Sequence, residues 1–161
     1  MKKFLLFILG FFIGILLFLP KTNLYYFIQT QLQKEHIYIN SKIKSDILSL
    51  SLINGKIYYE TMKIAEFQKI KIHIFLIYNK LTVKNLKLEI GNYKILNASV
   101  VYTILNPFKA EINAETNFAD VKGYINLKNR YIKLYFHKIT DISIKKFLKK
   151  DKKGYYYYVK Y

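Results

Sequence analysis

The chain has 161 residues, a formal net charge of +17 and no cysteine. This length fits one domain of modest size beside an N-terminal apolar segment. The lack of cysteine excludes disulfide bonds and thiolate metal sites. Of the 27 basic residues only Arg130 is an arginine. Lysine, isoleucine, asparagine, tyrosine and phenylalanine are abundant, as in proteins of AT-rich genomes. The charge therefore has two explanations, compositional bias or a surface for nucleic acid or anionic lipid.

The first element expected along the chain is a membrane anchor. Residues Phe4 to Pro20 carry no polar side chain and follow Lys2 and Lys3. A helix of this length spans roughly 25 Å, slightly less than the ~30 Å hydrocarbon core of a bilayer. The flanking lysines can extend to the interfaces and close that gap. The side chains expected to hold the anchor are Phe4, Leu5, Phe11, Ile15, Phe18 and Leu19.

A cleaved signal peptide is the alternative to an anchor, but it requires small residues at its cleavage site. Lys21, Thr22 and Asn23 follow the apolar run instead, so we expect an uncleaved anchor. Lys2 and Lys3 favour a cytoplasmic N-terminus. In a bacterium the protein would then be a single-pass inner-membrane protein with its main domain in the periplasm. The expected division is an anchor over 1–21, an amphipathic helix over 22–35 and a β-rich domain over 36–161.

The residues at positions 24, 27, 28, 31 and 32 follow a helical period and predict the amphipathic helix, with Thr22 or Asn23 as its N-cap. Its apolar stripe would rest either on the membrane or on the first strands of the domain. From His36 onward the apolar period changes to two, which predicts half-buried strands. The period slips by one residue near Lys84-Asn85, which predicts a bulge or a strand break.

Three dipeptides predict tight turns between strands, namely Asn54-Gly55, Gly91-Asn92 and Asn129-Arg130. The corresponding pairings are Leu52 with Ile57, Leu88 with Ile95, and Leu127 with Ile132, with apolar residues kept on one face in each case. Toward the C-terminus, residues 141–150 predict a short basic helix capped by Ser143, and Tyr155 to Tyr161 predict a final strand.

The fold class is therefore mainly β. We expect an antiparallel meander of about nine to eleven strands, coiled into an open, flattened barrel or groove. A transmembrane helix that continues into the amphipathic helix precedes the sheet, and the short helix lies near its end.

Two surfaces are candidate sites for binding. One is an apolar groove inside the coiled sheet, lined by Leu48, Leu50, Leu52, Ile57, Ile72 and Ile74; an interior filled by side chains is the alternative. The other is a basic and aromatic patch made by Lys145, Lys146, Lys149, Lys150, Tyr155, Tyr156, Tyr157 and Tyr158. The patch would take nucleic acid by stacking, anionic headgroups or a protein. It could equally be a solvated helix and an ordinary terminal strand.

No catalytic motif is found in the sequence, and we expect no enzyme activity, cofactor or metal. His36, His73 and His137 lack the spacing of metal ligands. Glu111 and Glu115 alternate with apolar residues and are expected to face water rather than form an acid/base pair.

The order of these segments resembles protein N of bacterial type II secretion systems and, more distantly, the AsmA-like envelope proteins. The similarity covers the anchor, the amphipathic stretch, the strand–Gly–strand step over residues 47–59, the strand from Leu81, and the basic and aromatic end from Phe147. It implies a non-enzymatic inner-membrane accessory of a type II secretion or related transformation apparatus, with secretion proteins as partners. The AsmA-like relatives imply a lipid-binding module instead, and the transformation systems imply a DNA-uptake accessory.

Overall fold

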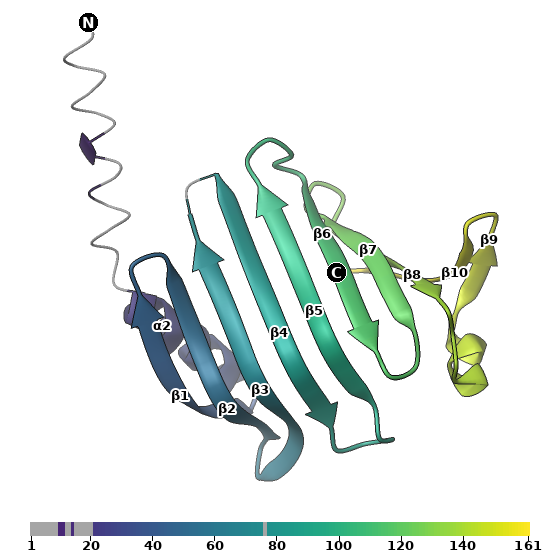
Figure 1. The fold of residues 1–161 in the computed structure, drawn as a ribbon, viewed down its shortest axis with the longest axis horizontal. Coiled ribbons are helices and arrows are strands. Elements are labelled where there is room, and N and C mark those ends of the chain that lie inside the picture. The colour runs from purple at the N-terminus through teal and green to yellow at the C-terminus, as the bar shows by residue number, and fades with distance from the viewer. Residues whose placement is uncertain (1–9, 12–13, 15–20, 76) are drawn as a thin grey trace, which may run out of the picture.

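The computed structural model describes residues 10, 11, 14, 21–75 and 77–161, and Figure 1 shows their arrangement. The described strands form one open sheet of ten antiparallel strands, in the order β1-β2-β3-β4-β5-β6-β7-β8-β10-β9. The prediction of a mainly β, antiparallel meander is thereby confirmed. Of the predicted anchor side chains only Phe11 is described, and it is exposed; Phe4, Leu5, Ile15, Phe18 and Leu19 lie outside the described residues. Among the described residues no helix is both long and apolar enough to cross a bilayer.

The elements follow one another with short connections. They are α2 (Lys21–Lys34), β1 (Ile37–Asp46), β2 (Ser49–Tyr59), β3 (Met62–Ile74), β4 (Tyr78–Leu88), β5 (Lys94–Thr103), β6 (Lys109–Thr116), β7 (Asp120–Asn126), β8 (Tyr131–His137), the 3-10 helix η1 (Ile142–Phe147), β9 (Lys149–Asp151) and β10 (Gly154–Lys160). Only β10 departs from chain order, because it pairs with β8 and leaves β9 at the edge.

Helix α2 lies against the face of β1 and β2, behind the sheet in Figure 1. Tyr25 is buried there with Leu50, Leu52 and Phe67 in the main core cluster. Its hydroxyl donates to the carbonyl oxygen of Ile39 at 3.3 Å. The aliphatic and aromatic parts of tyrosine are thus buried while its polar end is satisfied.

The predicted stripe of α2 is corrected by this packing. Phe27 and Ile28 belong to the expected apolar stripe, yet they are 62% and 37% exposed. The sheet-facing positions are Tyr25, Gln29 and Leu32, at helical spacing, and of these only Leu32 belongs to the predicted stripe. The helical period was visible in the sequence, but the amphiphilic tyrosine and glutamine were not counted as core residues. The expected caps Thr22 and Asn23 lie inside α2.

The expected hairpin at Asn54-Gly55 is wrong, because both residues lie inside the continuous strand β2. Leu52 is opposite Ile43 on β1 and Ile70 on β3, not opposite Ile57. Asn54 does adopt a positive φ of 50°. Gly55 is required for a different reason, since an added Cβ would overlap the ring of Phe67 on the neighbouring strand. The glycine makes room for an aromatic side chain across the ladder.

Irregular positions line up across five strands and form a crease at Ser41, Asn54, Gln68, Asn85 and Leu96. The ladder shifts register beside the first of these, in β1, and beside the last, in β5. Asn54 and Asn85 have positive φ, and the amide of Asn85 donates to Gln68 at 2.7 Å. The apolar period slips by one at this line, so Leu52 lies in the core cluster and Ile57 packs against it from the same face. The slip predicted in β4 is confirmed, although the strand does not break.

The other two predicted turns are confirmed in position but not in register. Ile95 is opposite Leu86 rather than Leu88, and Ile132 is opposite Ile125 rather than Leu127. Both shifts are by two residues, which preserves the face of every side chain because strands alternate with a period of two.

The C-terminal segment is less helical than predicted. Residues 142–147 form one short 3-10 helix, η1, and its cap is Asp141, whose carboxylate accepts from the backbone of Ser143 at 2.9 Å. Ser143 is therefore not the cap. Lys149 and Lys150 lie on strand β9 and not at a helix end. The predicted final strand is confirmed as β10.

Candidate functional site

The sheet has one apolar and one polar face, and most of its apolar face is not covered by a described helix. Two neighbouring rows of cross-strand partners, which run perpendicular to the strands, define the apolar face. One row is Leu50, Ile72, Leu81, Val100, Ile112, Gly123 and Leu134, and the other is Leu52, Ile70, Val83, Ala98, Ala114, Val121, Phe136 and Tyr155. Helix α2 packs on β1 and β2, so Leu50 and Leu52 are 0% and 4% exposed. The described residues of these rows on β4, β5 and β8 are only half-buried.

The predicted groove residues lie mostly in the covered part of this face. Leu50 and Leu52 are buried, and Ile57 and Ile72 pack against them, so these side chains are not open to a ligand. Ile74 is half-buried, and Leu48 is 41% exposed in the turn before β2. The accessible apolar surface lies farther along the sheet, from β4 to β10, where the sequence predicted no apolar groove.

The apolar face ends at Tyr155, the last ring of its second row. Tyr155 is opposite Phe136 on one side and Lys150 on the other. The Lys145 ammonium lies 5.4 Å and the Lys150 ammonium 5.6 Å from the centre of the Tyr155 ring. Two cations from separate elements thus contact one aromatic ring.

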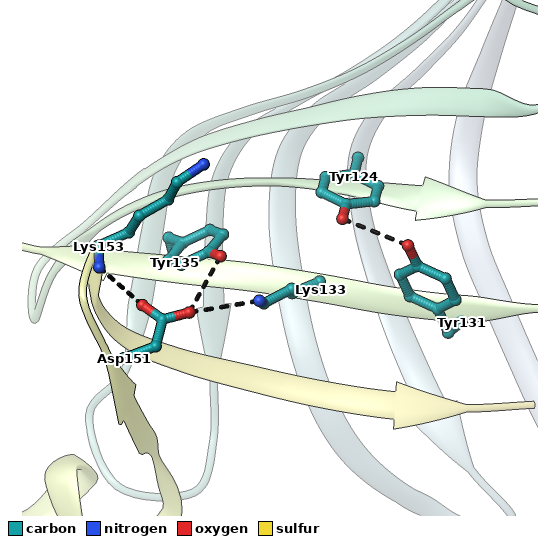
Figure 2. A network of polar contacts seen from close by, with 6 residues as sticks. All are labelled: Tyr124, Tyr131, Lys133, Tyr135, Asp151 and Lys153. Carbon is teal, nitrogen blue, oxygen red and sulfur yellow. Dashed lines mark hydrogen bonds and ion pairs between the residues drawn. The ribbon is translucent and has the colours of Figure 1, made fainter.

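On the polar face, strands β7, β8 and β10 form the Tyr–Lys cluster, drawn in part in Figure 2. Its members are Tyr124, Tyr131, Lys133, Tyr135, Tyr156, Tyr158 and, from the end of β9, Asp151. Tyr124 and Tyr131 share a hydroxyl–hydroxyl contact of 3.3 Å. The Lys133 ammonium lies 4.4 Å from the centre of the Tyr156 ring and 3.3 Å from the Asp151 carboxylate.

Asp151 and Lys133 hold each other in the charged form. The interaction with the Tyr135 hydroxyl, and then that with Asp151, raises the pKa of the Lys133 ammonium above its usual value. Partial desolvation opposes ionisation of Asp151, but hydrogen bonds from the Lys153 backbone, Lys133 and Tyr135 outweigh it and lower its pKa. Lys133 is therefore paired with a carboxylate, which leaves less of its charge to attract a phosphate.

The predicted basic and aromatic patch is divided between the two faces. Tyr156 and Tyr158 join the Tyr–Lys cluster on the polar face, and Lys149 is opposite Tyr156. Tyr155 and Tyr157 point to the apolar face, where Tyr157 is opposite Leu134. Lys146, in η1, is exposed and makes no described ion pair. A run of four tyrosines in a strand must alternate between faces. The matching alternation of Tyr131, Lys133 and Tyr135 was the signal that the sequence reading missed.

The polar face of the first strands is a lysine face. It consists of Lys42, Lys44, Lys69, Lys71, Lys80 and Lys84. Lys69 is directly opposite Lys84, and His73 is directly opposite Lys80. No salt bridge between described residues involves any of the six lysines. Burial, followed by the charges of Lys71 and Lys80, lowers the pKa of His73.

Within the described ranges, no three histidine or acidic side chains converge in a way that would hold a metal ion. His36, His73 and His137 lie on separate parts of the chain, before β1, on β3 and at the end of β8. Glu111 is exposed, as expected, and pairs with Lys109 at 3.4 Å; Glu115 is exposed as well.

The described architecture defines an open antiparallel meander with one end covered by a helix and one face largely apolar. Comparison of the chain with protein-family models, with curated proteins and with solved structures returned no match.

Proposed function

We propose that this protein is a non-enzymatic module of the cell envelope, anchored in the inner membrane by residues 4–20, that binds the acyl chains of lipids along its apolar face. The observation that carries the proposal is the apolar surface from β4 to β10, which α2 does not cover and which is half-buried except at the buried Val121. Surfaces of this kind on soluble domains mark sites for apolar ligands, partners or membranes.

The dimensions of the surface suit an acyl chain. Six strands, β4 to β8 and β10, follow one another in the sheet. With strands ~4.8 Å apart, they extend for about 24 Å. One leaflet of a bilayer contributes about half of the ~30 Å hydrocarbon core, so the apolar rows are longer than one leaflet is thick. The expected anchor would hold this surface close to the lipid supply.

The test uses the full chain in lipid nanodiscs with a phospholipid that carries a photoreactive group in its acyl chain. Crosslinked peptides are mapped by mass spectrometry. We expect crosslinks in β4 to β8 in addition to residues 4–20. Replacement of Val100 by aspartate, in the middle of the face, should reduce crosslinking on the sheet, whereas Ser99→Asp on the polar face is the matched control. Crosslinks confined to residues 4–20 would contradict the proposal.

A second candidate is an accessory of a type II secretion or related apparatus, and the edge strand β1 favours it. β1 is ten residues long and, among the described strands, pairs only with β2. A long edge of this kind can accept a strand from a partner protein.

A pull-down of the full chain from detergent-solubilised membranes should then recover secretion-apparatus subunits. Ser45→Pro should remove a backbone N–H that points away from β2, because its partner Leu50 bonds to β3, and should lower recovery. Lys71→Pro would disrupt an interior strand and serves as the folding control. Unchanged secretion in a deletion strain would count against this role.

A further inference from the structure

We propose that the β9–β10 end of the apolar face is a seat for the anionic headgroup of a lipid, formed by Lys145, Lys150 and Tyr155. This inference rests on the lipid-binding function proposed above and specifies the class of lipid.

The seat brings together three elements that are separate in the chain. Tyr155 lies on β10, Lys150 on the edge strand β9 and Lys145 on η1. The two ammonium groups lie 5.4 and 5.6 Å from the centre of the same tyrosine ring. The cross-strand pairing of Tyr155 with Lys150 fixes the second lysine on the apolar side of the sheet.

The local structure that presents Lys145 is held by its own hydrogen bonds. Asp141 accepts from both the backbone and the hydroxyl of Ser143, at 2.9 and 2.7 Å, at the start of η1. The carbonyl of Lys145 accepts from the backbone of Leu148 at 3.2 Å, where the chain enters β9. The position of Lys145 therefore depends on a defined turn and not on a free loop.

The charge of the seat is not neutralised by any described carboxylate. Neither Lys145 nor Lys150 takes part in a salt bridge of the described residues. Asp151, next in sequence to Lys150, bonds to Lys133 and Tyr135 in the polar-face cluster. The Asp141 carboxylate accepts from Ser143 and from Tyr93. Two cations held beside one ring thus lack an anion, and lysine is a compact charge that suits a phosphate group.

The order of side chains along the face matches the order of groups in a lipid. The half-buried Phe136 is followed in its row by Tyr155 and then by the lysines. An apolar stretch, an amphiphilic ring and a cationic end correspond to acyl chain, glycerol region and anionic headgroup. Tyrosine occupies the same position at the interfaces of membrane proteins.

The experiment compares two photoreactive phospholipids with the same acyl chain, one with an anionic phosphatidylglycerol headgroup and one with a zwitterionic phosphatidylcholine headgroup. The full chain is reconstituted in nanodiscs, and crosslinks on β4 to β8 are normalised to those on residues 4–20. A lysine near a lipid surface contributes about fivefold in affinity for an anionic lipid. We expect roughly that preference for phosphatidylglycerol for each lysine of the seat.

The double variant Lys145→Gln/Lys150→Gln should abolish this preference and leave crosslinking by phosphatidylcholine unchanged. The variant Lys109→Gln/Lys138→Gln removes the same charge from residues that are paired with Glu111 and Asp120, and it should retain the preference. Equal crosslinking by both lipids in the wild-type chain, or equal loss in the two double variants, would overturn the seat while acyl binding stands. Failure of both lipids to crosslink the sheet would overturn the acyl-binding function and the seat together.

Discussion

Replacement of Tyr25 by alanine tests whether α2 is held on the sheet by this one side chain. Tyr25 is 7% exposed, and a buried tyrosine removes about 150–250 Å² from water. At ~25 cal/mol per Å² this amounts to about 4–6 kcal/mol as an upper bound. Measured truncations of large core side chains cost about 3–5 kcal/mol. We therefore expect Tyr25→Ala to lower the free energy of unfolding by about 3–5 kcal/mol.

The assay is urea unfolding of the full chain in mild detergent, followed by the circular dichroism of the sheet. Tyr25→Phe keeps the ring but loses the 3.3 Å hydrogen bond to Ile39, and it should cost about 1 kcal/mol. Tyr26 is 57% exposed, so Tyr26→Ala should cost less than about 1 kcal/mol. Equal destabilisation by Tyr25→Ala and Tyr26→Ala would refute the assigned packing of α2.

Three further substitutions test the sheet itself. Gly55→Ala should destabilise by about 1–3 kcal/mol through overpacking against the neighbouring aromatic ring, and urea unfolding should show it; a neutral effect would contradict the cross-strand contact. Lys84→Glu should stabilise by about 0.2–1 kcal/mol, because it converts the like-charge pair with Lys69 into an opposite-charge pair, and this gain should shrink as salt is added. The pKa of His73, followed by NMR, should lie below its ordinary value, and Lys80→Gln should raise it only in part, since burial is the larger cause. This histidine contributes stability above its unfolded pKa of about 6.5, and that contribution is lost as pH falls toward the lower folded pKa.

The number and direction of the strands followed from sequence because alternation with a period of two is a local signal. The turns at Gly91-Asn92 and Asn129-Arg130 were found for the same reason. Their registers were not, since the ladder beyond each turn is set by packing across strands. Asn54-Gly55 shows most clearly what local pattern cannot decide, because a residue with positive φ occurs both in turns and in the crease of this sheet. The two are distinguished by the ring of Phe67, twelve positions away in the sequence.

The candidate sites were harder to predict than the strands. A linear patch of lysines and tyrosines over residues 145–158 looked like one surface, but strand alternation divides it between two faces. Tyr131, Lys133 and Tyr135 join that region only because β10 pairs with β8, ahead of β9. Pairing between elements that are not adjacent in the chain cannot be read from local pattern. The sequence left open whether the interior lined by Leu50 and Leu52 is filled, and the side chain that packs on them is a tyrosine, Tyr25.

The meander also governs how the domain opens. Each strand from β2 to β7 pairs only with the strands before and after it in the chain, so interactions pass along the sheet in one dimension, as in repeat proteins. At the β1 end of the sheet, α2 packs on the strands through the core cluster of Tyr25. At the opposite end the sheet finishes with the three-residue strand β9. Amide hydrogen exchange should therefore be slowest in β2 and β3 and become progressively faster toward β10, because local opening begins where the fewest contacts hold the chain. The end that we propose to receive the lipid headgroup is the end that opens most often.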